Sequence, residues 1–166
     1  MGNMKDDMGG IEADARMAVL QKLRVVMRAA QQHSNWIEKQ CGVSGTQLWM
    51  MHELADAGVM RVGELAVRLA VQQSTASNLI EDLVKCGYAS KHRDRDDQRV
   101  VNLKLTEAGK TLLASAPTPA RGLVQEALTR LDPEGLARLN AGLQSLVDSI
   151  EGLDQSYAFL PLPFNM

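Results

Sequence analysis

Residues 63–105 read GELAVRLAVQQSTASNLIEDLVKCGYASKHRDRDDQRVVNLKL, and this stretch decides the fold. Apolar residues three and four positions apart predict two short helices, over residues 63–70 and 73–85, with a break at 71–72. The period then changes to two over residues 99–105, which indicates a strand with one buried face. The stretch therefore predicts two helices followed by strand structure.

A β-hairpin completes this pattern. Residues 88–93 are the expected partner strand, and the charged segment 94–98 is the expected turn. Gly87 can take the left-handed backbone that ends the preceding helix. The alternation places three residues on one face of the second strand, namely Val101, Leu103 and Leu105. Two helices with a tight break, followed by this hairpin, predict a winged helix-turn-helix.

On the N-terminal side, a long helix is expected over residues 13–39, whereas residues 1–12 are polar, contain glycine and are expected to be disordered. Ser44 suits the N-cap of a second helix, which Gly58 ends. The long helix carries an apolar stripe at spacings of three and four, formed by Val19, Leu23, Val26, Ala30 and Ile37.

On the C-terminal side, Thr106 begins a helix that Pro117 and Pro119 must interrupt, because proline removes a helix hydrogen bond. Asp132 followed by Pro133 is a strong start signal for the last helix. That helix carries an apolar seam suited to packing against another helix, formed by Leu136, Leu139, Leu143, Leu146 and Ile150. The apolar, proline-bearing tail after it is not expected to be helical.

The expected fold class is mainly α with a small β-hairpin wing, that is, a winged helix-turn-helix plus a helical dimerisation region. A homodimer is expected because the terminal helices present apolar seams that have no partner inside the winged module. The expected divisions are a disordered N-terminus (1–12), a helical dimerisation region (13–42 and 107–153), a DNA-binding domain (43–106) and an apolar C-terminal tail (154–166).

The composition favours a helix-rich globular protein of 166 residues with ordinary apolar content and few aromatic residues. No stretch approaches the roughly 20 apolar residues that span a membrane, and Met1–Gly10 lacks an apolar signal core. Cys41 and Cys86 do not make a disulfide framework. A cytoplasmic protein with no membrane contact and no cofactor is therefore expected.

The charge distribution points to nucleic acid although the net charge is −2. Residues 61–104 hold eight basic and six acidic side chains, so this centre is basic while the rest of the chain is acidic. A basic centre fits contact with DNA by one part of the molecule. In a winged helix-turn-helix, the second helix presents its first residues to base edges in the major groove. The basic hairpin reaches the neighbouring minor groove.

The sequence resembles the MarR family of transcription regulators over roughly residues 15–151. Five segments carry the resemblance together, in order and spacing: Glu64–Ala66, Ser74–Ser77, Leu83–Tyr88, Asp97–Arg99 and Leu105–Gly109. The resemblance implies an obligate homodimer joined by its terminal helices and bound to a palindromic operator on double-stranded DNA. It also implies a repressor that is released by a small phenolic or aromatic acid, or by cysteine oxidation.

The resemblance places five polar residues at the start of the recognition helix: Gln73, Ser74, Thr75, Ser77 and Asn78. Glutamine and asparagine can pair with adenine, whereas serine and threonine are less selective. Each of the five can instead bond only to phosphate or to the helix itself. This helix start lacks the Lys or Arg that the family often has there, because residues 71–80 contain neither. Phosphate attraction must then come from Arg61, Arg68, Lys91 and the wing.

The wing carries the remaining DNA-binding candidates. Arg99 matches the family's wing arginine and Asp97 the acid that orients it, although the two can also form a purely structural ion pair. Arg93 and Arg95 can contact phosphate or remain solvated.

The effector site is expected between the first two helices and the winged module, at His33, Trp36, Trp49 and His52. Core packing is the competing interpretation for these four residues. Arg28 can meet a ligand carboxylate or face solvent.

Three other functions remain open. A redox sensor would use Cys41, although the family's peroxide sensors usually carry the reactive cysteine nearer the start of the first helix. Cys86 is expected to pack under the wing. A metal sensor would use Cys41, His52 and Glu53. An enzyme lacks support, since the chain has no phosphate-binding glycine loop, metalloprotease motif or nucleophile motif.

Overall fold

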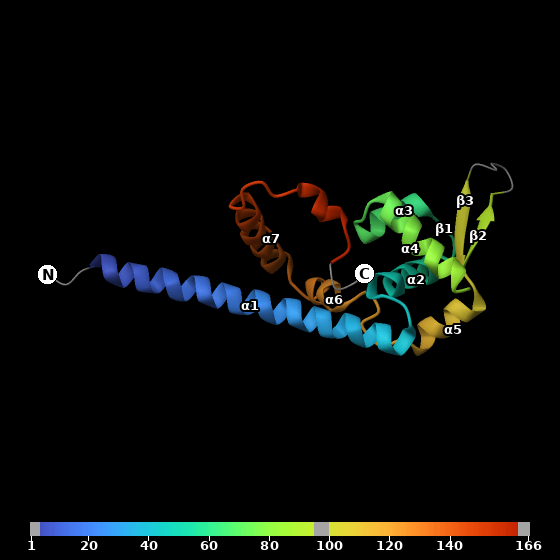
Figure 1. Ribbon diagram of the computed structural model, residues 1–166, viewed down its shortest axis with the longest axis horizontal. Coiled ribbons are helices and arrows are strands. Elements are labelled where there is room, and N and C mark those ends of the chain that lie inside the picture. Colours follow the sequence, from blue (N-terminus) through green and yellow to red (C-terminus); the bar gives the residue numbers. More distant parts are fainter. Residues whose placement is uncertain (1–3, 95–99, 163–166) are drawn as a thin grey trace.

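The computed structural model describes residues 4–94 and 100–162. Its elements are α1 (Met4–Cys41), α2 (Gly45–Ala57), β1 (Met60–Arg61), α3 (Val62–Leu69), α4 (Gln73–Lys85), β2 (Ala89–Arg93), β3 (Val101–Leu105), α5 (Glu107–Ser115), α6 (Leu123–Thr129), α7 (Pro133–Asp148) and a 3-10 helix, η1 (Gln155–Phe159). Helix α1 is a long rod with the winged module at its C-terminal end, and α7 stands away from that module (Figure 1). The fold class is mainly α with a small sheet, as expected from the sequence.

The core belongs to the winged module and the end of α1. Helices α2, α3 and α4 pack together and against the sheet, so their periodic apolar residues meet in one cluster. Its fully buried side chains include Ile37, Leu48, Met51, Leu65, Ile80, Leu83 and Leu103. Ser44 caps α2 in a reciprocal capping box with Gln47, which explains why the helix begins there.

The turn between α3 and α4 takes a left-handed backbone at Ala70, whose φ is 53°. The Ala70 and Val71 N–H groups donate to carbonyls of α3, which ends that helix and lets the chain turn into α4. The two predicted helices and the break between them are confirmed, with α3 beginning at Val62 and not at Gly63.

The wing is a three-stranded antiparallel sheet in the order β1-β3-β2, which Figure 1 shows at the end of the molecule opposite the N-terminus. Ala89 pairs with Leu105, and Arg93 with Val101. Strand β1, which pairs Met60 with Leu103, was not predicted because two residues show no period.

Gly109 fixes the base of the wing, because a Cβ atom there would lie 2.1 Å from the Tyr88 carbonyl oxygen. Only glycine allows this close approach of α5 to the start of β2. The Thr106 side chain accepts from the Gly109 N–H and donates to the Gly87 carbonyl, so the junction is bonded on both sides.

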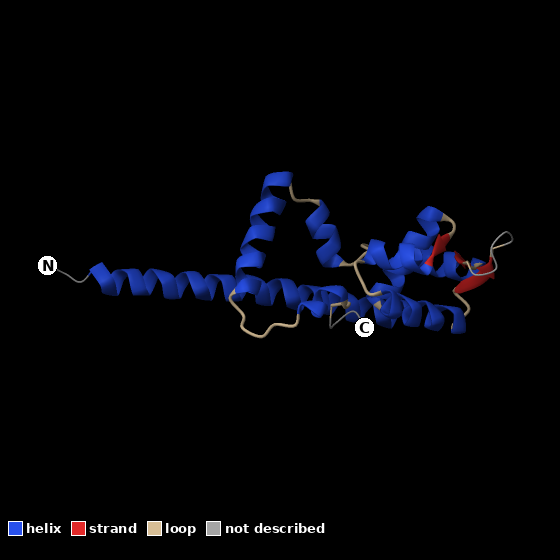
Figure 2. Ribbon diagram, turned by 90° about the horizontal axis from the view of Figure 1, so that it is seen from above, coloured by secondary structure: helices blue, strands red, loops and turns tan. Residues whose placement is uncertain are grey.

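The terminal helices leave apolar side chains uncovered, and Figure 2 shows α1 extending well past the winged module. The exposed large apolar residues of these segments include Met17, Val19, Leu20, Val25, Val26, Met27, Leu131, Leu136, Leu139, Leu143, Leu146 and Ile150. The chain exposes 11,565 Å², against about 8,100 Å² expected for a compact monomer of its mass. One protomer therefore leaves a large apolar surface in water.

Two predictions at the termini differ from the structure. Helix α1 begins at Met4, whereas disorder was predicted over residues 1–12; extending an existing helix adds one hydrogen bond per residue fixed, which favours such a continuation. The tail was predicted to lack a helix, but Gln155–Phe159 form the short η1. The Asp154 side chain caps it by accepting from the Ser156 N–H.

Candidate functional site

The N-terminal end of α4 presents the predicted recognition residues. Gln73, Ser74 and Asn78 are exposed, and Thr75 and Ser77 are half-buried. Buried Ala76 and Ile80 on the opposite face hold the helix against the core, so the polar face is fixed in orientation. The five residues share one end of one helix, which is the geometry that major-groove readout requires.

No side chain caps the start of α4, because its N-cap residue is Gln72, whose side chain makes no capping bond. The first N–H groups of a helix are unpaired within it and carry partial positive charge. Such an end is suited to a DNA phosphate. This feature offsets the absence of Lys and Arg from residues 71–80.

The wing places Arg93 at the end of β2, exposed and away from the core. Asp94 accepts from the Asn102 side chain at 3.0 Å, which ties the two strands near the tip. The other predicted wing residues, Arg95, Asp97 and Arg99, lie outside the described residues.

Two of the cations expected to attract phosphate are engaged within the protein. Lys91 forms an ion pair with Glu81, which joins β2 to α4. Arg68 pairs with Glu53 at 3.0 Å. Arg61 is exposed at the start of α3, where its backbone N–H donates to the Glu64 side chain.

Glu53 is the centre of an ionic cluster that joins α2, α3 and the segment before α6. Its carboxylate is 10% exposed and accepts from Arg68 at 3.0 Å, from Arg121 at 2.9 Å and from Trp49 at 3.0 Å. Burial alone would raise the pKa of Glu53, but these hydrogen bonds outweigh it and hold the pKa below its ordinary value. Arg121 also reaches Asp56 at 2.8 Å. The cluster fastens the linker between α5 and α6 to the winged module.

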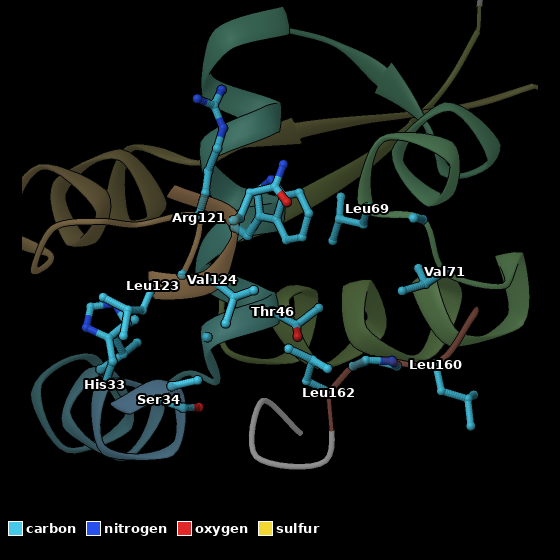
Figure 3. Close-up of a pocket in the computed structure, with 18 of the residues that line it drawn as sticks. His33, Ser34, Thr46, Leu69, Val71, Arg121, Leu123, Val124, Leu160 and Leu162 are labelled. Atoms are coloured by element: carbon cyan, nitrogen blue, oxygen red, sulfur yellow. The ribbon is translucent and has the colours of Figure 1, made fainter. Parts of the chain in front are cut away.

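A cavity of about 250 Å³ lies beside this cluster, between α1, α2, the turn after α3 and the segment from Arg121 to Gln125. Figure 3 shows Thr46, Leu69 and Val124 around it, with Arg121 at its edge. A cavity of about 150 Å³ with apolar walls already holds benzene. The cavity is therefore large enough for an aromatic ring with a polar substituent, and Arg121 supplies a positive charge beside it.

The structure divides the four predicted effector residues into two groups. His33 and Trp49 line the cavity, and the His33 ring is held by a 3.1 Å hydrogen bond from Nε2 to the Pro119 carbonyl. Trp36 is 45% exposed and does not line the cavity, and its ring lies against that of His33 with centroids 5.7 Å apart.

His52 does not line the cavity, and its Nδ1 lies 3.2 Å from Asp56. Arg28 is exposed on α1 away from the cavity. The arginine beside the cavity is Arg121. Nothing in the local sequence marked it, because its partners Glu53 and Asp56 are 65 or more positions away in the chain.

The cysteines do not have the surroundings of a redox sensor. Cys41 is buried at the end of α1, and burial raises the pKa of its thiol, which disfavours the reactive thiolate. Cys86 was predicted to pack under the wing, but it is exposed, because it follows the last turn of α4 on its solvent side.

The metal-sensor alternative is also without support. Within residues 4–94 and 100–162, no three His, Cys, Asp or Glu side chains come together as a metal site would require. In the same ranges no helix is long and apolar enough to cross a membrane.

Comparison with known proteins gives a family match for the winged module. Residues 42–100 match the model of the MarR family. An HTH-type transcriptional regulator of Mycobacterium leprae (strain TN) is 29% identical over 124 residues, which cover 75% of this chain and 85% of the relative. The HTH-type transcriptional repressor MdtR of Bacillus subtilis (strain 168) is 32% identical over 73 residues, which are 44% of this chain and 46% of MdtR.

Among solved structures, a mutant of E. coli MarR complexed with operator DNA superposes with a TM-score of 0.52 at 18% identity, covering 78% of this chain and 96% of that one. This similarity shows the fold. The relatives are named as transcriptional regulators, in agreement with the expectation that the chain is not an enzyme. Together with the winged module, these findings show that residues 42–100 match the MarR family of transcriptional regulators and that the chain has the same winged-helix fold.

Proposed function

We propose that the chain is a homodimeric repressor that binds a palindromic operator and is released from it by a small aromatic acid. The observation that carries the DNA-binding part is the orientation of α4, whose start is polar, exposed and uncapped while its other face is fixed in the core. The structure that resembles it is bound to operator DNA, and one relative is named a repressor. Both support the proposal.

The dimer follows from the exposed apolar surface of α1, α6 and α7. The excess over a compact monomer is roughly 3,500 Å² per protomer, or about 7,000 Å² for two protomers. This excess is more than enough to supply the roughly 2,000–5,000 Å² in total that obligate dimers commonly bury. Association of the terminal helices would set the separation of two α4 helices. Successive half-sites on one face of DNA lie about 34–36 Å apart, so that separation decides whether both helices can bind.

The effector part of the proposal rests on the cavity beside Arg121. A carboxylate bound there would compete with Glu53 and Asp56 for the guanidinium. Because Arg121 belongs to the linker between the helical region and the winged module, its movement would change how the two are joined. A ligand shifts the equilibrium only if it prefers the state that cannot bind the operator.

Binding selection from a random library of DNA duplexes tests the DNA-binding part. The wild-type protein should enrich a palindrome with half-sites one helical turn apart. Gln73→Ala or Asn78→Ala should relax the preference at the base that each residue reads, at a cost of about 1–3 kcal/mol. Lys85→Gln, at the other end of α4, is the control and should leave the sequence preference unchanged. A library that stays random after selection with the wild-type protein would overturn the proposal.

Light scattering tests the dimer. The wild type should have twice the 18.1 kDa mass of one chain. Leu143→Glu should lower the mass and the operator affinity together, because it places a charge in the apolar seam of α7. Ala141→Glu adds the same charge on the other side of this helix and should leave both properties intact. A wild-type monomer at micromolar concentration would contradict the dimer.

A further inference from the structure

The segment that follows α7 returns to the helix-turn-helix. Residues 154–162, here called the strap, follow α7 after a short connecting segment and lead back to the turn between α3 and α4 (Figure 1). The Gln72 N–H donates to the Phe159 carbonyl at 2.9 Å. Gln72 is the N-cap of α4, so the strap is bonded to the residue that begins the predicted recognition helix.

The strap has local order of its own. Asp154 caps η1 by accepting from the Ser156 N–H at 2.9 Å, and η1 ends at Phe159. Pro161 follows, and its ring restricts φ to an extended or turn value. The strap therefore loses less conformational entropy on docking than a flexible tail of the same length would lose.

The strap also forms one wall of the cavity beside Arg121. Its lining residues are Ala158, Leu160, Pro161 and Leu162. Figure 3 shows Leu162 beside Thr46 and Leu160 on the side of Val71. Leu160 and Leu162 are 45% and 44% exposed, so each lines the cavity with only part of its side chain. The Tyr157 and Phe159 side chains are not part of the lining and are 62% and 53% exposed. The strap thus contributes one pair of apolar side chains to the cavity wall and keeps another pair outside it.

We propose that the strap is a gate of this cavity within the same chain. With the strap docked, the cavity has room for one substituted ring, and a larger aromatic acid enters only when the Leu160 and Leu162 side chains move out. This inference rests on the effector cavity of the proposed function. Strap and ligand would compete for the same apolar walls. A strap that is closed about 90% of the time weakens ligand binding about tenfold, because only the open fraction can bind.

The bond to Gln72 couples this gate to DNA binding. When the strap leaves the cavity, the Phe159 carbonyl moves with it and the Gln72 N–H loses its partner. The start of α4 is then less constrained, and α4 carries the residues proposed to read the operator. Ligand entry and the order of the recognition helix are therefore linked through one backbone hydrogen bond.

Two full-length variants test the gate. Leu160→Ser with Leu162→Ser removes the side chains that face the cavity. Tyr157→Ser with Phe159→Ser removes two apolar side chains of the same strap that do not line the cavity. This variant keeps the backbone carbonyl of residue 159, which accepts from the Gln72 N–H. The probe is 2-naphthoate, with affinity measured by calorimetry, and the second readout is hydrogen exchange of the Gln72 amide.

The cavity-facing variant should bind 2-naphthoate about tenfold more tightly than the wild type and should exchange the Gln72 amide faster. The control variant should match the wild type in both measurements. Equal affinity in all three proteins, or weaker binding by the cavity-facing variant, overturns the gate but leaves the effector cavity standing. Binding by none of them overturns the effector cavity of the proposed function, and the gate falls with it. Unchanged exchange at Gln72 in the cavity-facing variant overturns the coupling to α4.

Discussion

Replacing Arg121 by glutamine should destabilise the protein by about 1.5 kcal/mol, and most of the loss should come from Glu53. Arg121 donates to Glu53 at 2.9 Å and to Asp56 at 2.8 Å. A hydrogen bond to a charged group contributes about 1.5–3 kcal/mol. Arg121 is 40% exposed, so water screens its charge and the Glu53 bond is expected at about 1 kcal/mol. The more exposed Asp56 pair should add about 0.5 kcal/mol.

A double-mutant cycle with Glu53→Gln isolates the pair. Urea unfolding at one fixed protomer concentration gives the four free energies, since the stability of a dimer depends on concentration. The coupling energy between the two sites should be about 1 kcal/mol. Arg130→Gln is the control, because Arg130 is 76% exposed and forms an ion pair with Glu126, four residues before it. This change should cost about 0.3 kcal/mol. A coupling energy near zero would refute the view that this cluster fastens the linker to the winged module.

Three further outcomes are expected. Gly109→Ala should lower the free energy of unfolding by about 3 kcal/mol, because its Cβ would meet the Tyr88 carbonyl. The midpoint of urea unfolding should fall with it, and full wild-type stability would contradict the close approach. Iodoacetamide followed by mass spectrometry should label Cys86 and spare Cys41, whose pKa is raised by burial; faster labelling of Cys41 would reopen the redox alternative. The pKa of Glu53 is lowered in the folded protein, so its carboxylate stabilises the fold fully above pH 4.5, the ordinary pKa, and loses this effect as the pH falls through the folded-state pKa. The difference in free energy of unfolding between wild type and Glu53→Gln should therefore be constant above pH 4.5 and shrink below it. A pH-independent difference would contradict the ionic cluster.

The winged module could be predicted from sequence because its signals are local. The change of period from helix to strand, the N-cap at Ser44 and the start signal at Asp132 all act within a few residues, and the structure has an element boundary at each. Strand β1 escaped prediction for the opposite reason, since two residues carry no pattern and the strand exists only through its pairing with β3.

The lining of the cavity beside Arg121 could be predicted only in part. The position of His33 and Trp49 followed from their placement on the first two helices. Trp36 and His52 lie on the same helices but outside the lining, because a step of three residues turns a side chain about 60° around the helix from its neighbour, which is enough to move it off the cavity wall. Arg121 and the strap could not be found from sequence, because both act on residues that are tens of positions away in the chain.

The most direct test of the central claim is fluorescence anisotropy with two labelled duplexes at one salt concentration. One duplex carries the palindrome enriched by the wild-type protein, and the other carries the same bases in shuffled order. A sequence-specific regulator should bind the palindrome about 10³-fold or more tightly, with two chains per duplex. Equal affinity for both duplexes, or binding of one chain per palindrome, would contradict the account.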